Sequence, residues 1–390
     1  MEEARGSERL GTYLKRLREG YGYTLRRVEE RSSAIGEPID NSQLSRFEKG
    51  KAYPSFDKLR VLARIFNVSV QNFSDIIDLE QFEPLKPSPA PFDQLVQAGW
   101  EAIDHGGYGE AYVTFEQAYE IALATANGGL APDASAEARL LMAISLKKLG
   151  KLAMAESELR GLLRERRSLG RLLRVRALLQ LAQVQREQGD LYLGSMTARE
   201  CLALASEEGD LDSQAAILNM LANVHHDENE YEEAATYYER ALRIVEQLGG
   251  REEMRATILI NLGGCRASLS RVDAGTRLIR EALDIARGRN LRRTEALALT
   301  RLAEISMERG DLKRAKTLLA ESDNAAKEGK EELVDILFLN TFRSWEMARK
   351  EANAVRERLA LGRLKHYRSY LERRFPEVDK FDAYIGKVQS

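Results

Sequence analysis

A short polar segment, DNSQLSRFEKGK (residues 40–51), concentrates side chains that form hydrogen bonds. Asp40 is a typical N-cap residue, and Gln43 three positions later completes an approximate capping box, so the segment is expected to begin a helix. The polar side chains that such a helix would present are Asn41, Ser42, Gln43 and Arg46. Because only Leu44 and Phe47 are large and apolar, the helix is predicted to serve as a hydrogen-bonding surface rather than a core element.

Other groupings of reactive residues are weaker. HHDENE (225–230) combines histidines and carboxylates that are able to bind a metal. His225 and His226 point about 100° apart on a helix, so a polar helix end is the favoured interpretation. GGYG (106–109) lacks the lysine-containing context of a phosphate loop. No Ser/His/Asp, Cys/His or paired-carboxylate pattern indicates catalysis, so neither enzyme activity nor a cofactor or metal is expected.

Composition indicates a folded protein of more than one domain. The chain has 390 residues, of which 44% are hydrophobic and 31% charged. It contains no apolar run near the roughly 20 residues that span a bilayer, and its N-terminus is charged throughout. Cys201 and Cys265 are expected to be buried thiols in a reducing cytoplasm. Residues 1–78 hold 14 Lys and Arg against 12 Asp and Glu, so this head is mildly basic.

The body of the chain repeats itself. Six segments align without gaps and start at residues 106, 150, 189, 229, 270 and 310. Small residues recur at two positions of each unit; they are Ala111, Ala155, Gly194, Ala234, Gly275 and Ala315 in one series, and Ala143, Ala182, Ala222, Gly263 and Ala303 in the other. Small side chains at fixed spacing allow two helices to approach closely. A period near 40 residues with this pattern predicts an α-solenoid.

Proline marks the boundary before the repeats. Pro84, Pro87, Pro89 and Pro91 predict an extended linker over residues 79–93. The head before it, residues 1–78, is predicted to form five short helices. Thr24 and Ser69 are expected to cap two of them, and Phe56 is expected to face the core of the fourth.

Two resemblances follow from these motifs. LREGYGYT (17–24) followed by SQLSRFEKGKAYPSFDKLRVLARIFNVS (42–69) resembles the Cro/repressor-type helix-turn-helix, or XRE, family. The repeats resemble tetratricopeptide (TPR) repeats over residues 94–362, with a degenerate seventh unit from about 331 and a helical cap over 363–390. The implied fold class is all-α: a five-helix Cro/repressor-like head followed by a TPR-like solenoid.

The helix-turn-helix resemblance implies double-stranded DNA as a partner. Its recognition helix would place the base-reading residues Asn41, Ser42, Gln43 and Arg46 in the major groove. The resemblance assigns sugar–phosphate contacts to Thr24, Arg26, Ser45, Lys49, Lys51 and Tyr53. The sequence departs from the family pattern at Leu25, where glutamine is usual, and in RSSAIGEPI (31–39), which is expected to lengthen the turn before the recognition helix.

The TPR resemblance implies a ligand-facing concave surface. Transferring its usual positions to this chain gives an effector groove of Gln183, Arg186, Asn219, Asn223, His226, Asp227, Thr300, Glu304 and Asn340. Asn219 and Asn223 share a helix face, and asparagine amides can hold a peptide backbone. A generic wet polar surface is the alternative. The arginines of RERRSLGRLLRVR (164–176) similarly predict either a basic patch or ordinary pairing with neighbouring carboxylates.

These features together predict a cytoplasmic, sequence-specific transcriptional regulator. Its solenoid would form a homodimer and sense a peptide or protein effector, with no membrane partner. An interaction adaptor, whose head contacts protein instead of DNA, is the first alternative, and a phosphatase-like enzyme regulator is the second.

Overall fold

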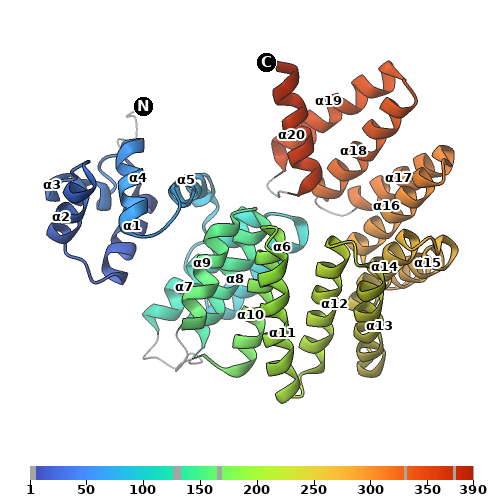
Figure 1. Cartoon of the computed structure of the whole chain (residues 1–390), viewed down its shortest axis with the longest axis horizontal. Coiled ribbons are helices and arrows are strands. Elements are labelled where there is room, and N and C mark those ends of the chain that lie inside the picture. Colours follow the sequence, from blue (N-terminus) through green and yellow to red (C-terminus); the bar gives the residue numbers. More distant parts are fainter. Residues whose placement is uncertain (1–5, 126–132, 165–168, 329–331, 372–374, 390) are drawn as a thin grey trace. The chain divides into compact units, whose positions relative to one another are not determined.

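The computed structural model describes residues 6–125, 133–164, 169–328, 332–371 and 375–389. Its elements in these ranges are all helices (Figure 1). The chain divides into two compact units, residues 1–88 and 89–390. Pro132 and residues 165–168 of the arginine-rich segment lie outside the described ranges. No described helix is long and apolar enough to cross a membrane.

The head contains the five helices that the sequence predicts. They are α1 (Glu8–Gly20), α2 (Leu25–Ile35), α3 (Asn41–Glu48), α4 (Phe56–Ile65) and α5 (Val70–Asp78). Thr24 and Ser69 cap α2 and α5 as expected, since each hydroxyl accepts a backbone N–H of the first turn. Leu14, Leu44 and Phe73 are fully buried and join α1, α3 and α5 in one core.

Two expectations about the head were wrong. Phe56 is 66% exposed, because it is the first residue of α4 and points outward beside its cap, Ser55. Residues 79–85 of the expected linker form a 3-10 helix, η1 (Leu79–Leu85). Leu79 and Phe82 of η1 are buried, and Arg9 Nε donates to Glu83 Oε1 at 2.8 Å, so η1 is part of the head.

The turn before α3 is shorter than expected. α2 continues to Ile35 and ends at Gly36, whose φ of 94° suits a residue without a side chain. Ser32 organises the remaining turn, because its hydroxyl accepts the backbone N–H of Ile39 at 2.9 Å and donates to the carbonyl of Glu29 at 2.8 Å. Ile39 is fully buried and fixes the start of α3 against the core.

The second unit is a stack of helix pairs that follow one another along the chain (Figure 1). The pairs are α6 (Phe92–His105) with α7 (Tyr108–Ala124), α8 (Ala134–Lys148) with α9 (Leu152–Arg164), α10 (Arg171–Glu187) with α11 (Leu191–Glu207), α12 (Leu211–Asp227) with α13 (Tyr231–Leu248), α14 (Glu252–Ser268) with α15 (Val272–Gly288), α16 (Arg292–Glu308) with α17 (Leu312–Lys327), and α18 (Val334–Lys350) with α19 (Ala354–Tyr370). The terminal helix is α20 (Pro376–Gln389).

These helix boundaries differ from the predicted ones at both ends of the solenoid. Its first helix begins at Phe92, two residues earlier than expected. The degenerate seventh unit is a complete pair, because α19 continues to Tyr370 rather than ending at 362. The cap is therefore the single helix α20, which packs Val378 and Phe381 against Phe338 and its neighbours.

The small residues lie where helices of one pair touch. All members of both series are buried. A Cβ atom built on Gly263 of α14 would lie 2.8 Å from the backbone oxygen of Gly275 in α15, which leaves no room for a side chain. Cys201 and Cys265 are also buried, and burial raises the pKa of these thiols to about 12 and about 11 respectively. The close helix contacts and the burial of both cysteines are confirmed.

We expect Gly275→Ala to destabilise the solenoid by roughly 1–3 kcal/mol, because the added methyl group forces α14 and α15 apart. Urea unfolding followed by circular dichroism measures this loss. Gly288→Ala at the end of the same helix is the matched control, since a Cβ there meets nothing within 4 Å. Equal stability of the two variants would show that the close approach at Gly275 is not required.

Candidate nucleic-acid interface and solenoid groove

The start of α3 is fixed by its cap. Asp40 Oδ1 accepts the backbone N–H of Gln43 and the hydroxyl of Ser42, both at 2.8 Å. The hydrogen bond from the Gln43 backbone, followed by that from Ser42, holds the pKa of Asp40 below its ordinary value. The cap therefore carries a full negative charge near neutral pH and orients the first turn of the helix.

The end of α3 is held by an ion pair. Arg18 of α1 donates from Nε and Nη2 to the two carboxylate oxygens of Glu48, at 2.6 and 2.9 Å. The side chains of Arg18 and Glu48 are only 13% and 8% exposed. Arg18 Nη1 also donates to the carbonyl of Tyr23 at 2.9 Å, which ties the turn before α2 to the same point. Sequence reasoning did not identify this pair, because its two residues are 30 positions apart.

The predicted base-reading residues differ in the exposure of their side chains and in whether another side chain binds them. Asn41, Ser42 and Arg46 are exposed on α3, whereas Leu44 and Phe47 are buried as predicted. Gln43 is partly buried, and its Oε1 accepts Lys58 Nζ at 2.9 Å rather than completing the capping box.

The predicted backbone-contacting residues also lie largely in solvent. Thr24, Arg26, Lys49, Lys51 and Tyr53 are exposed, while Ser45 is half-buried. Gly50, with a φ of 64°, terminates the helix and brings the two lysines that flank it into one turn. A Cβ on Gly50 would lie 2.8 Å from the Cα of Glu8, so only glycine fits at this turn.

The solenoid presents a second polar surface on α12 and α14. Asn219 and Asn223 lie one turn apart on α12, and Asn261 Nδ2 of α14 donates to Asn219 Oδ1 at 3.3 Å. Tyr238 Oη donates to Asn223 Oδ1 at 2.6 Å, and burial raises the pKa of this phenol, which stays protonated. Among the described residues, the amide N–H₂ groups of Asn219 and Asn223 have no acceptor and remain available to a ligand. The offsets transferred from the TPR pattern missed Asn261.

Several other predicted groove residues form hydrogen bonds or ring contacts with neighbouring side chains. Arg186 Nε donates to Asp227 Oδ2 at 2.6 Å, and Gln183 accepts from Lys147. The ring of His226 lies edge-on to Tyr231, with centroids 5.3 Å apart. These contacts order the side chains along one face of α10 and α12.

Thr300 borders the smaller of the two hollows described below, whereas Asn340 is buried instead of lining a groove as predicted. They are 2% and 1% exposed, and Thr300 Oγ1 donates to Asn340 Oδ1 at 2.7 Å. Asn340 Nδ2 donates to Ser322 Oγ at 2.8 Å, so the polar atoms satisfy one another between α16, α17 and α18. Glu304 is the predicted residue that stays near the surface, where it accepts Arg343 Nε at 2.8 Å.

Two adjoining hollows follow this surface. One, of about 500 Å³, is lined by Gln183, Asn219 and Met254 among others. The next, of about 310 Å³, is lined by Asn261, Arg301 and Glu304. Thr257 of α14 lines both, which makes them neighbouring parts of one surface.

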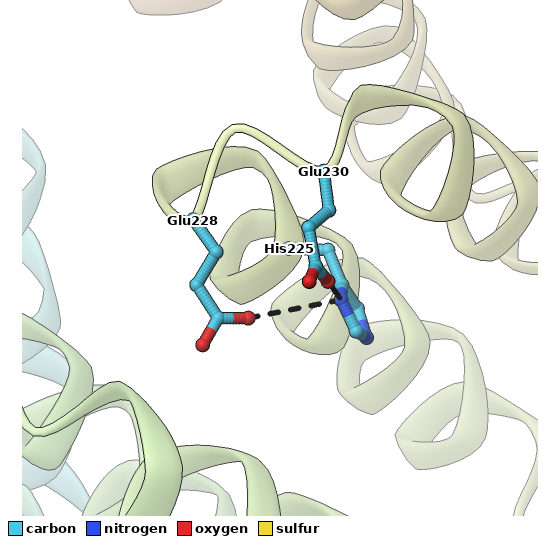
Figure 2. Close-up of side chains that lie close together, drawn as sticks. All are labelled: His225, Glu228 and Glu230. Carbon is cyan, nitrogen blue, oxygen red and sulfur yellow. Dashed lines mark hydrogen bonds and ion pairs between the residues drawn. The ribbon is translucent and has the colours of Figure 1, made fainter.

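The HHDENE segment brings His225, Glu228 and Glu230 together at the turn between α12 and α13 (Figure 2). His225 Nδ1 lies 2.6 Å from Glu230 Oε2 and 3.8 Å from Glu228 Oε2. The imidazole stacks on Tyr237, with centroids 5.1 Å apart. The short hydrogen bond to Glu230 closes the turn between α12 and α13. His226 is directed elsewhere, as the helical spacing predicts.

Three arginines of the arginine-rich segment pair with carboxylates. Arg171 contacts Glu208, Arg174 contacts Glu200 at 3.6 Å, and Arg176 contacts Glu137 at 3.3 Å. The pairing favours the ordinary interpretation of these arginines over a basic patch.

Comparison with known families agrees with this geometry. Residues 14–73 match the helix-turn-helix family model, and residues 173–247 match the tetratricopeptide repeat model. Both resemblances predicted from the sequence are confirmed: the chain joins a helix-turn-helix head to a TPR-type solenoid. No curated protein matches the chain.

Several solved structures are similar to this chain at low identity, and the two Rap structures, with TM-scores above 0.5, share its fold. A Rap protein complexed with competence and sporulation factor is 14% identical, with a TM-score of 0.56 over 94% of this chain and 99% of that chain. The Rap conjugation gene regulator of the plasmid pLS20, in complex with the Phr* peptide, is 14% identical, with a TM-score of 0.55 over 93% and 96%. Bacillus thuringiensis PlcR, in complex with the peptide PapR7 and DNA, is 19% identical, with a TM-score of 0.43 over 75% and 99%.

Proposed function

We propose that the protein is a cytoplasmic, non-enzymatic transcriptional regulator that reads double-stranded DNA through α3. The observation that carries this proposal is the exposed polar face of α3, held at one end by the Asp40 cap and at the other by the Arg18–Glu48 pair. A helix so fixed presents Asn41 and Arg46 at constant positions, as groove recognition requires.

The solenoid supports an effector role within this proposal. The unpaired amide groups of Asn219 and Asn223 suit the donor and acceptor pattern of an extended peptide backbone. The Rap regulator of the same fold was solved with a peptide, which is compatible with a peptide in these hollows. For such a ligand to regulate, it must bind one arrangement of the solenoid better than another.

Homodimerisation completes the proposed mechanism. The head carries few excess positive charges, so two heads on neighbouring half-sites would supply affinity that one head lacks. Sedimentation with and without DNA measures this association. A monomer on a single half-site would contradict the dimer.

DNA binding itself is tested by replacing one residue of each predicted class. We expect Asn41→Ala to relax sequence preference, with a loss of about 1–3 kcal/mol on the preferred site only. Lys51→Ala should weaken every sequence alike and reduce the salt slope by about one. Fluorescence anisotropy against selected and scrambled duplexes at several salt concentrations measures both effects.

Lys15→Ala serves as the control, because Lys15 is exposed on α1 and outside the predicted interface. Identical effects of Asn41→Ala and Lys51→Ala on every duplex would contradict the assigned roles. Absence of DNA binding by the wild-type chain at low salt would favour the adaptor alternative.

A further inference from the structure

A basic pocket lies on the solenoid away from the Asn219–Asn261 surface. It has a volume of about 460 Å³, and its lining residues come from α15, the C-terminal part of α16 and the start of α17. Four arginines line it together with only two aspartates; the arginines are Arg277, Arg280, Arg309 and Arg314. This local excess of positive charge stands out in a chain whose net charge is −2.

Both aspartates that line the pocket already form hydrogen bonds within the protein. Asp273 Oδ1 accepts Arg309 Nη1 at 3.3 Å, and Asp311 caps α17 by accepting the backbone N–H of Arg314 at 3.0 Å. In the described part of the chain, no carboxylate forms an ion pair with Arg277, Arg280 or Arg314. Three guanidinium groups therefore face the pocket with their charges uncompensated by the protein.

The pocket also contains a neutral donor and an apolar floor. Thr276 Oγ1 is buried and has no hydrogen-bond partner among the described residues. A buried hydroxyl without a partner is costly unless a ligand or water satisfies it. Leu302 and Ile305, which are 4% and 6% exposed, form the floor between the arginines.

The repeat scaffold does not require this arrangement. The position of Arg277 holds another residue type in each of the other five aligned units. The position of Arg280 also holds arginine in the second and third units, as Arg160 and Arg199, but no other unit has arginine at both positions. Like charges one turn apart destabilise a helix slightly when nothing binds between them. The arginine pair is thus a feature of this unit rather than of the solenoid fold.

We propose that this pocket binds a small molecule carrying a phosphate group. Guanidinium groups match the geometry of phosphate oxygens and form charge-assisted hydrogen bonds with them, while the Thr276 hydroxyl supplies one further donor. The apolar floor gives room for an organic substituent, and the volume lies in the range of small-ligand sites. This site is independent of the DNA and peptide functions proposed above.

Isothermal titration calorimetry on the full chain tests the proposal with adenosine monophosphate, inorganic phosphate and adenosine. We expect the two phosphates to bind and adenosine not to bind. Tighter binding of adenosine monophosphate than of inorganic phosphate supports an organic ligand on Leu302 and Ile305. Equal binding supports the same site with the free anion as its source.

Arg277→Gln/Arg280→Gln should weaken phosphate binding by about tenfold or more, and Thr276→Val by a few fold. Both arginines are exposed, so the double variant should retain its unfolding midpoint and its DNA affinity. Arg243→Gln is the matched control, because Arg243 is an exposed arginine of α13 outside the pocket. No phosphate binding, equal losses in the control, or adenosine binding as tight as that of its phosphate would overturn the proposal.

Discussion

Replacing Arg18 with alanine is expected to destabilise the head by about 3 kcal/mol and to abolish specific DNA binding. The substitution leaves Glu48, which is only 8% exposed, without its bidentate partner at the end of α3. It also frees the carbonyl of Tyr23 from its contact with Arg18. Since α3 has just eight residues, we expect its C-terminal end to lose its fixed position when the contact with Arg18 is removed.

Amide hydrogen exchange localises this effect, because the chain has two units and a single unfolding midpoint would mix them. Peptides covering α1 and α3 should exchange faster in Arg18→Ala, while those of the solenoid remain unchanged. Arg60→Ala is the control, since its ion pair with Asp57 spans 3.8 Å and both side chains are at least 60% exposed. Normal protection of α3 in Arg18→Ala would show that the ion pair is dispensable.

Replacing Arg343 with alanine is expected to release α20 from the end of the solenoid. Its guanidinium contacts three carboxylates from three helices; they are Glu304 at 2.8 Å, Glu346 at 3.0 Å and Glu377 at 2.7 Å. The Arg343 side chain is 18% exposed. Its loss leaves Glu346 and Glu377 without a cation among the described residues, while Glu304 keeps Arg301 at 2.8 Å, and we expect this to cost roughly 3 kcal/mol. Arg343→Lys should recover only part of this, because an ammonium group lacks the planar fork of donors.

Trp345 reports the release directly. It is 4% exposed, and its ring lies 4.9 Å from that of Tyr384 in α20. In a Trp100→Phe background, Arg343→Ala should shift the Trp345 emission to longer wavelength. Arg358→Ala on α19 is the control, because Arg358 is exposed and forms no ion pair within the described ranges. An unshifted spectrum in Arg343→Ala would contradict the role of Arg343 in holding α20.

The sequence predicted most reliably what depends on neighbouring residues. The caps at Thr24, Asp40 and Ser69, and the close helix contacts at Gly275, follow from local chemistry or from a strict period. Phe56 was misplaced, because helical periodicity does not tell whether the first turn lies over the core or beyond its edge. Residues 79–85 were misread, because tertiary burial of Leu79 and Phe82 overrides the extended preference of a proline-rich segment.

The candidate sites were predicted less completely. The ligand-facing positions transferred from the TPR pattern correctly placed Asn219 and Asn223 on one surface. They also selected Thr300 and Asn340, whose polar atoms form a hydrogen bond with each other inside the solenoid. Arg18–Glu48 and Gln43–Lys58 join positions 30 and 15 residues apart, and no local rule connects them. Such partners become visible only when the fold fixes which helices touch.

The buried contacts of Thr300, Ser322 and Asn340 have a mechanical consequence. Hydrogen bonds weaken steeply with displacement, so sliding α16 past α18 by about 1 Å would break several of them together. The amide hydrogen bonds between α12 and α14 are longer, at 3.3 Å from Asn261 to Asn219 and 3.5 Å to Asn223, and lie beside the apolar side chains of Leu218, Ile258 and Leu262. We therefore expect the last two pairs to be a stiff block, and a ligand on the asparagine surface to act by shear between α12 and α14.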